Sequence, residues 1–192
     1  MIAIVKYNAG NIRSVQNALN RLGQKCIITS DPDEILAAER VIFPGVGEAS
    51  TAMSFLRGKN LDNVIKSVKQ PFLGICLGLQ LMCKYSEEGH TECLGIFDSK
   101  VEHFPTGDKV PHMGWNNFES LNGPLFRDVS KEDDVYYVHR YYASISNETI
   151  AKCNYILPFS TAFQKDNFFA TQFHPEKSAS VGEQILKNFL AL

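Results

Sequence analysis

Short apolar runs alternate with segments of helical periodicity through the first half of the chain. The runs are bounded by polar residues, Gly or Pro, which is typical of buried strands. Four such runs are IAIV at 2–5, KCIITS at 25–30, ERVIFPG at 39–45 and PFLGI at 71–75. Apolar residues at helical spacing predict helices over 11–23 and around 48–68. Strands that alternate with helices pair in parallel, so this half predicts an α/β layered domain.

The second half of the chain changes character. Its apolar runs are short, aromatic and β-branched, and they predict strands in a mixed or antiparallel extension of the sheet. These runs are KVEHF at 100–104, NNFESL at 116–121, DVYYVHRYYA at 134–143, TIAKCNYI at 149–156, STAFQK at 160–165 and FFATQFH at 168–174. An amphipathic helix over 178–192, capped by Ser178 or Ser180, ends the chain. We expect one domain over residues 1–192.

Composition and charge narrow the class of protein. The 192 residues are 44% apolar and 21% charged, as in ordinary globular proteins, and the net charge is −2. No block of like charge suggests binding to nucleic acid or to a membrane surface. No apolar run reaches transmembrane length, and the first ten residues lack the features of a signal peptide. These features predict a cytoplasmic protein.

The cysteines are expected to be free thiols. Their number is odd, no C-x-x-C pair occurs, and they stand at positions 26, 76, 83, 93 and 153. A zinc site could use Cys83, His90 and Cys93, but their spacing fits no common ligand pattern. We therefore expect no metal.

Four segments with candidate chemistry follow predicted strands. They are YNAGN at 7–11, PGVG at 44–47, GICLG at 74–78 and QFHPEK at 172–177. In an open α/β sheet, ligands bind beyond the carboxyl ends of the strands. We expect the four segments to meet on one rim of the sheet.

GICLG has the form of a nucleophile elbow with cysteine in place of serine. The flanking glycines leave room for a tight turn from strand to helix, and a helix N-terminus favours the thiolate of Cys76. The amide of Leu77 points into the same space and could bind an oxyanion. The alternative is a buried structural cysteine with glycines that serve packing. The pentapeptide alone does not decide between the two.

HPE at 174–176 supplies the partners that a thiol nucleophile needs. His174 can accept and return a proton, and Glu176 can orient the imidazole ring. The alternative is a surface turn, but the elbow cysteine in the same sheet favours the catalytic interpretation. PGVG is either a simple turn or a mobile loop that offers a second oxyanion N–H. We expect His139 to be structural or at the rim of the site, and His90, His103 and His112 to be surface or structural residues.

Taken together, these motifs resemble the class I glutamine amidotransferases, and the resemblance spans the whole chain. The more specific match is to the glutaminase subunits of imidazole glycerol phosphate synthase. It rests on YNAGNIRSV, FPGVG, GICLG with Gln80, SEEG at 86–89, PHMGWN at 111–116, YVH at 137–139 and TQFHPEKS at 171–178. The resemblance implies a three-layer fold with a central mixed, mostly parallel sheet flanked by helices.

The resemblance also implies a reaction. Cys76 attacks the side-chain amide of glutamine, His174 protonates the departing ammonia, and Glu176 orients His174. Gly45 and Val46, with Leu77, form the oxyanion site. Glutamine is contacted by residues in four segments, namely Gly47, Gln80, Glu88 and the backbone of His139, Arg140 and Tyr141. No cofactor is implied.

A partner subunit is implied as well. The resemblance predicts a heterodimer with a (β/α)8-barrel synthase subunit, which receives the ammonia and forms imidazole glycerol phosphate in histidine biosynthesis. Four residues are placed near that partner: Asn11, Trp115, Tyr136 and Lys177. Trp115 could instead lie in the core, and Lys177 could be a solvated lysine. A paralogous glutaminase that serves another acceptor synthase, and a degenerate binding subunit, are the competing hypotheses.

One position departs from the family pattern. After His139 the family usually has a small hydroxyl residue, and this chain has Arg140. A guanidinium can bind the carboxylate of glutamine. Alternatively, the side chain turns away and leaves that contact to the backbone.

Overall fold

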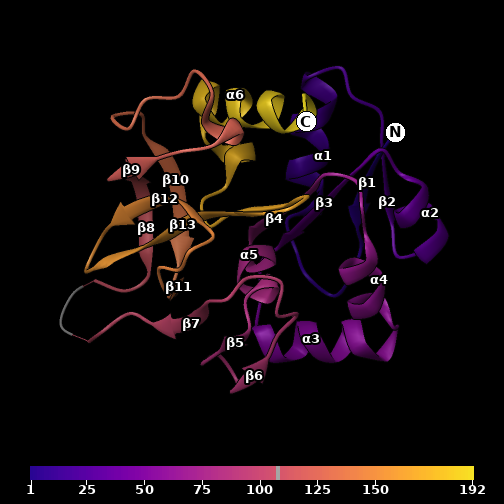
Figure 1. The fold of residues 1–192 in the computed structure, drawn as a ribbon, viewed down its shortest axis with the longest axis horizontal. Helices are drawn as coiled ribbons and strands as arrows, with labels where there is room; N and C mark the ends of the chain where they lie inside the picture. The colour runs from indigo at the N-terminus through magenta and orange to yellow at the C-terminus, as the bar shows by residue number, and fades with distance from the viewer. Residues whose placement is uncertain (107–108) are drawn as a thin grey trace.

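A central sheet separates two layers of helices (Figure 1). The computed structural model describes residues 1–106 and 109–192. The strands are β1 Ile2–Val5, β2 Cys26–Thr29, β3 Arg40–Gly45, β4 Phe72–Cys76, β5 Tyr85–Ser86, β6 Thr91–Glu92, β7 Lys100–His103, β8 His112–Asn116, β9 Ser120–Leu121, β10 Val135–His139, β11 Tyr141–Ala143, β12 Thr149–Asn154, β13 Pro158–Lys165 and β14 Phe168–Thr171. The helices are α1 Ile12–Arg21, α2 Pro32–Ala37, α3 Ala49–Gly58, α4 Leu61–Ser67, α5 Leu77–Met82 and α6 Ala179–Leu190, with 3-10 turns η1 Pro124–Phe126 and η2 Pro175–Lys177.

The sheet is parallel where the first half of the chain builds it. Its strand order is β2-β1-β3-β4-β14-β13-β11-β7-β5-β6, and β12 pairs with β13 and β9. Strands β2, β1, β3, β4 and β14 all pair in parallel, whereas β13 runs antiparallel to β14. A mixed, mostly parallel sheet flanked by helices is therefore confirmed.

Alternating side chains of the strands feed two cores. In β1, Ala3 and Val5 pack into the core that contains α2, α3, α4 and α5, while Ile2 and Ile4 pack into the core that contains α1 and α6. This alternation is what the two-residue period of a strand requires when both faces are covered. It explains why the first four strands are continuous apolar runs.

The first half folds nearly as the pattern predicts, with two differences. The predicted helix around 48–68 is two helices, α3 and α4, that break at Lys59 and Asn60, where Asn60 adopts φ 55°. Helix α2 was not predicted, although it carries a clear start signal. Asp31 accepts hydrogen bonds from the N–H groups of Asp33 and Glu34, and Pro32 occupies the first turn.

The segment 134–143 is not one strand, as its pattern suggested. It breaks at Arg140 into β10 and β11, which lie in different sheets. Strand β10 pairs with β8 in a separate two-stranded ribbon, and β11 joins the central sheet. The strand predicted over 116–121 is also wrong in extent, because only Ser120–Leu121 is extended there while β8 ends at Asn116.

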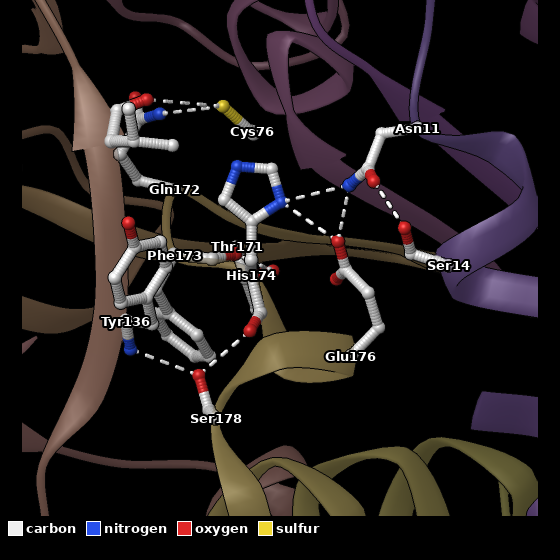
Figure 2. Close-up of polar contacts among 11 residues, drawn as sticks. Asn11, Ser14, Cys76, Tyr136, Thr171, Gln172, Phe173, His174, Glu176 and Ser178 are labelled. Atoms are coloured by element: carbon white, nitrogen blue, oxygen red, sulfur yellow. Dashed lines mark hydrogen bonds and ion pairs between the residues drawn. The ribbon is translucent and has the colours of Figure 1, made fainter. Parts of the chain in front are cut away.

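The C-terminal helix α6 begins directly after Ser178, as predicted, but the Ser178 hydroxyl does not cap it. The hydroxyl donates to the carbonyl of His174 at 2.7 Å and accepts from the N–H of Tyr136 at 2.9 Å (Figure 2). It thus joins the segment after β14 to strand β10. Within residues 1–106 and 109–192, no helix has the length and apolar character needed to span a membrane.

Candidate active site

The four segments with candidate chemistry meet at one edge of the sheet. Strands β1, β3, β4 and β14 are neighbours that run in parallel. Their carboxyl ends therefore place YNAGN, PGVG, GICLG and QFHPEK side by side. The predicted convergence is confirmed.

Cys76 occupies a strained turn between β4 and α5. Its backbone has φ 54° and ψ −106°, a conformation that residues other than Gly rarely adopt. The two glycines of the motif are needed for close packing. A Cβ on Gly78 would lie 1.9 Å from the carbonyl oxygen of Phe43, and one on Gly74 would lie 2.5 Å from Met82 Sδ. The geometry matches a nucleophile elbow.

His174 stands between Cys76 and Glu176 (Figure 2). Its Nδ1 donates to Glu176 Oε1 at 2.8 Å, and both side chains are almost fully buried. Its Nε2 points toward Cys76 and has no hydrogen-bond partner among the described residues. Sulfur, imidazole and carboxylate therefore have the order that a catalytic triad requires.

Asn11 completes the support of this pair. Its Nδ2 donates to Glu176 Oε1 at 2.6 Å and lies 3.4 Å from His174 Nδ1, while its Oδ1 accepts from the Ser14 hydroxyl. Asn11 was expected near a partner. It lies within hydrogen-bond distance of the two buried side chains and so orients the pair, while its contact with a partner stays a prediction.

The charges favour an imidazolium ring. Burial acts to lower the pKa of His174, but the adjacent Cys76 sulfur and the Glu176 carboxylate outweigh it and raise that pKa to about 10. A ring that carries its proton beside the sulfur can act as a general acid when a leaving group departs.

A pocket of about 470 Å³ opens in front of the sulfur. It is lined by Val46, Gly47, Cys76, Leu77, Gln80, Glu88, Pro111, Val138, His139, Arg140 and Tyr141. All six residues expected to contact glutamine are in this lining. Pro111 and Val138 were not predicted to be there.

The PGVG loop lies beside the elbow. Gly45 ends β3 opposite Cys76 in the parallel register. The carbonyl oxygen of Val46 accepts from the N–H of Gly10 at 3.2 Å, which holds the loop against YNAGN. Leu77 is the first residue of α5, where N–H groups have no partner within the helix. The residues expected at an oxyanion site are therefore adjacent to the sulfur.

Gln80 and Glu88 line the pocket from two different elements. Gln80 Nε2 donates to the carbonyl of Tyr141 and to Gln172 Oε1, each at 3.0 Å. Glu88 Oε2 accepts from the N–H of Ala49 at 2.8 Å. Burial is the main reason why the pKa of Glu88 is raised. Both side chains are fixed by the protein before any ligand binds.

The segment 139–141 forms the opposite wall. His139 Nδ1 donates to the carbonyl of Tyr141 at 2.8 Å, and its Nε2 accepts from Nδ1 of the buried His112 at 2.9 Å. Burial lowers the pKa of His139 to about 3 and that of His112 to about 4. His112 is thus a structural residue, as expected, and Arg140 is exposed at the pocket.

The remaining residues predicted at a partner face lie near the catalytic segment in sequence or by contact, since the carbonyl of Tyr136 accepts from the N–H of His174 at 2.9 Å. Trp115 on β8 is 54% exposed, and its ring packs against Tyr136 on β10 with centroids 5.8 Å apart. A core position for Trp115 is therefore excluded. Lys177 is exposed directly after Glu176.

The zinc alternative finds no support in the described part of the chain. No group of three or more His, Cys, Asp or Glu residues there could hold a metal ion. The thiols of Cys83 and Cys93 face the carbonyls of Leu79 and Thr91, and His90 pairs with the Tyr85 hydroxyl.

Two residues of the site were missed by sequence reasoning. Gln172 is fully buried beside Cys76, and Tyr7 packs its hydroxyl against Gly45. Both stand inside segments that were singled out, so their position in the sequence was a usable signal. Their side-chain types, an amide and a phenol, did not suggest a role beside a thiol.

Comparisons with known proteins agree with the geometry. The family model "Glutamine amidotransferase class-I" matches residues 3–192. "Imidazole glycerol phosphate synthase subunit HisH" of Bacteroides fragilis is 55% identical over 194 residues, which cover 100% of this chain and 99% of the relative. Proteins of the same name from Bacteroides thetaiotaomicron and Vibrio parahaemolyticus are 54% and 41% identical, over 100% of this chain and 99% and 98% of their own.

Solved structures share the fold. One described as a glutamine amidotransferase superposes with a TM-score of 0.75 at 18% identity, covering 100% of this chain and 98% of that one. Another, a glutamine amidotransferase from Thermotoga maritima, gives 0.66 at 15% identity over 99% and 82%. The chain belongs to the class-I glutamine amidotransferase family and, within it, to the group of imidazole glycerol phosphate synthase subunits HisH.

Proposed function

We propose that this protein hydrolyses the side-chain amide of glutamine and passes the ammonia to a synthase subunit. The observation that carries the proposal is the buried His174–Glu176 pair, 2.8 Å apart, facing Cys76 at the base of a 470 Å³ pocket. This is the arrangement of a thiol nucleophile, a base and an orienting carboxylate. The pocket is large enough for a single amino acid.

The reaction follows from these positions. Cys76 Sγ attacks the amide carbon of glutamine, and the resulting oxyanion is bound by the N–H groups of Leu77 and of the PGVG loop, residues 44–47. His174 protonates the amide nitrogen, and ammonia leaves. Water then attacks the thioester, His174 accepts its proton, and glutamate departs as the Cys76 thiolate re-forms.

Charged groups at the pocket suit an amino acid with its zwitterion intact. Glu88 supplies a carboxylate for the α-ammonium group, and Arg140 supplies a guanidinium for the α-carboxylate. Gly47, Gln80 and the backbone of 139–141 add polar contacts around the same ligand. Arg140 thereby takes the place of the small hydroxyl residue that the family usually has.

The names of the relatives support the proposed acceptor of the ammonia. The relatives are named as subunits of imidazole glycerol phosphate synthase, which favours a heterodimer with a (β/α)8-barrel synthase subunit over a glutaminase for another acceptor. Intact Cys76, His174 and Glu176 argue against a degenerate subunit that only binds. The cytoplasm is the expected location because all five cysteines are free thiols, which is typical of a reducing compartment.

Glutamine hydrolysis with and without the barrel subunit and its nucleotide ligand tests the proposal. We expect weak activity alone and strong activation in the complex, because the Val46 carbonyl is held by Gly10 and the loop must move to present its N–H. Equal activity in both conditions would refute this account of activation. Cys76→Ala should abolish hydrolysis and leave complex formation intact, and residual turnover in this variant would refute the nucleophile assignment.

A further inference from the structure

A buried amide touches the sulfur of Cys76. Gln172, the residue after β14, is 0% exposed, and its Nε2 lies 3.7 Å from Cys76 Sγ (Figure 2). This separation is within the range for an N–H donor on sulfur. Nothing in the proposed triad uses this side chain.

The oxygen of the same amide group accepts a hydrogen bond from Gln80. Gln172 Oε1 accepts from Gln80 Nε2 at 3.0 Å, and the second proton of that nitrogen goes to the carbonyl of Tyr141 at 3.0 Å. Both N–H bonds of Gln80 are therefore occupied. Its carbonyl oxygen is the polar group left for a ligand in the pocket, where it can accept a hydrogen bond but not donate one.

The position of Gln172 is fixed by the sheet. Its N–H donates to the carbonyl of Thr161 at 2.8 Å, which extends the pairing of β14 with β13 by one residue. Thr161 is itself fully buried. The Gln172 side chain is therefore ordered before a substrate binds. Its contacts with the sulfur and with Gln80 cost little further side-chain entropy when binding occurs.

We propose that Gln172 is a positioning residue of the amidotransferase reaction, which orients the Cys76 sulfur with its N–H and the Gln80 carbonyl with its own oxygen. This inference rests on the proposed function. It connects the nucleophile Cys76 to the pocket residue Gln80 through the hydrogen bonds of Gln172. A neutral donor beside a thiolate stabilises it without competing for the proton. The titratable groups that face the sulfur are His174 and Tyr7.

The pH dependence of Cys76 alkylation tests the first half of the proposal without any glutamine. The purified chain is treated with iodoacetamide over a pH series, and modification at Cys76 is followed by peptide mass spectrometry. Gln172→Met keeps the length of the side chain but has no N–H. In this variant, the pH at which alkylation of Cys76 reaches half its maximal rate should rise by about one unit. At a fixed pH well below that midpoint, alkylation should then be about tenfold slower.

Two further variants make this measurement decisive. Gln172→Glu keeps an oxygen for Gln80 but places an anion beside the sulfur, so its midpoint should rise at least as far. Gln184→Met removes another partly buried amide, whose one side-chain hydrogen bond among the described residues goes to Asn188 on α6, and should leave the midpoint as in the parent chain. Unchanged midpoints in both folded Gln172 variants would overturn the proposal, and folding is checked by circular dichroism.

Steady-state kinetics in the complex test the second half. Gln172→Met should lower kcat and also raise KM for glutamine severalfold, because Gln80 loses its anchor. Gln172→Glu should lower kcat with a smaller rise in KM, because an oxygen still accepts from Gln80. Equal effects on KM in the two variants would overturn the link to Gln80. A parent complex that does not hydrolyse glutamine would refute the proposed function, while the alkylation profile would still report on Gln172.

Discussion

Tyr7 brings a hydroxyl group into the core beside the PGVG loop. The side chain is 5% exposed, and its hydroxyl has no hydrogen-bond partner among the described residues. A Cβ on Gly45 would lie 1.9 Å from this oxygen, so only glycine fits at that position. Burial, followed by the nearby Cys76 sulfur, raises the pKa of Tyr7, and the phenol stays neutral. An unsatisfied buried hydroxyl is a local source of instability.

Tyr7→Phe should therefore stabilise the protein. Removal of the hydroxyl eliminates its desolvation penalty, and we expect the free energy of unfolding to rise by about 1 kcal/mol. Urea unfolding followed by circular dichroism measures the change. Tyr137→Phe is the matched control, because the fully buried Tyr137 hydroxyl bonds Thr161 Oγ1 at 2.7 Å. That variant should lose about 1 kcal/mol. A loss in Tyr7→Phe would mean that the hydroxyl has a favourable partner in solution.

Residue types explain which parts of the site the sequence predicts. Cys76, His174 and Glu176 are reactive groups with a recognised chemistry. Cys76 and His174 stand at the ends of predicted strands, and Glu176 follows His174 by two residues. Gln172 stands two residues before His174 but carries a neutral amide, which is common in any sheet. Its role depends on a contact with Cys76 across two strands, and such a contact has no local signature.

Helix α6 packs closely against the catalytic segment at Gly182. A Cβ on Gly182 would lie 1.9 Å from the carbonyl oxygen of Pro175, the residue before Glu176. Pro175 belongs to the turn η2, so the obstacle is backbone and cannot rotate away. The helix and the turn must move apart to accept any larger residue.

Gly182→Ala should destabilise the protein although alanine favours helices. We expect overpacking to lower the free energy of unfolding by about 2 kcal/mol, against a propensity gain of about 1 kcal/mol. Thermal and urea unfolding measure the net loss. Gly58→Ala in α3 is the control, because a Cβ there would meet no atom of the described residues within 4 Å, and the expected gain is about 0.5 kcal/mol. Similar gains in both variants would contradict the close approach of α6 to η2.

Strands β8 and β10 carry a buried pair of neutral histidines. His112 donates to His139, and its own Nε2 lies 3.4 Å from Asn116 Nδ2. The ordinary pKa near 6.5 applies in the unfolded chain, whereas burial lowers the pKa of His112 to about 4 in the folded protein. The unfolded state therefore binds more protons between these values. Stability is retained above about pH 6.5 and lost as the pH falls toward 4.

His112→Asn should reduce this acid sensitivity. Asparagine keeps a donor near the position of Nδ1 but does not titrate, so the loss of unfolding free energy between pH 7 and pH 5 should shrink by on the order of 1 kcal/mol. Urea unfolding at the two pH values gives the difference. The exposed His90 provides the control, and His90→Asn should leave the pH dependence as in the parent chain. An unchanged slope in His112→Asn would mean that the buried pair does not control acid stability.

The break at Arg140 shows what element patterns cannot reveal. The aromatic and β-branched residues of 134–143 suit an extended strand, and β10 and β11 are indeed both extended. What separates them is pairing, because β10 joins β8 and β11 joins β7 and β13. The change of partner leaves the backbone at 139–141 along the pocket wall. Pairing depends on distant segments, so the local pattern does not encode it.

At the scale of the molecule, the parallel half is the predictable half. Its strands are buried on both faces and alternate with helices, and this pattern fixes both the layers and the rim where ligands bind. The second half was predicted as strands in a mixed or antiparallel extension of the sheet, without an order. The order of these strands in the sheet and the separate β8–β10 ribbon arise from long-range pairing. The position of Trp115, which lies on β8, depends on that pairing.

The β8–β10 ribbon presents an apolar surface beside the catalytic rim. Met113 and Trp115 on β8 are 59% and 54% exposed, and Tyr136 packs beside Trp115. Large exposed aromatic residues are frequent at the energetic centre of protein interfaces. Trp115 is the only tryptophan in the sequence, so its fluorescence reports directly on this surface.

Trp115→Ala should weaken binding of the barrel subunit by at least about fivefold, because truncation of a central aromatic side chain removes more than about 1 kcal/mol. Calorimetric titration measures the affinity, and a blue shift of tryptophan emission in the parent complex would show that the ring becomes buried. Leu36→Ala is the control, since Leu36 is 44% exposed on α2, at the opposite end of the sheet from the ribbon (Figure 1). Equal affinities of both variants and the parent would place the partner elsewhere, and the exposed ring would then need another explanation.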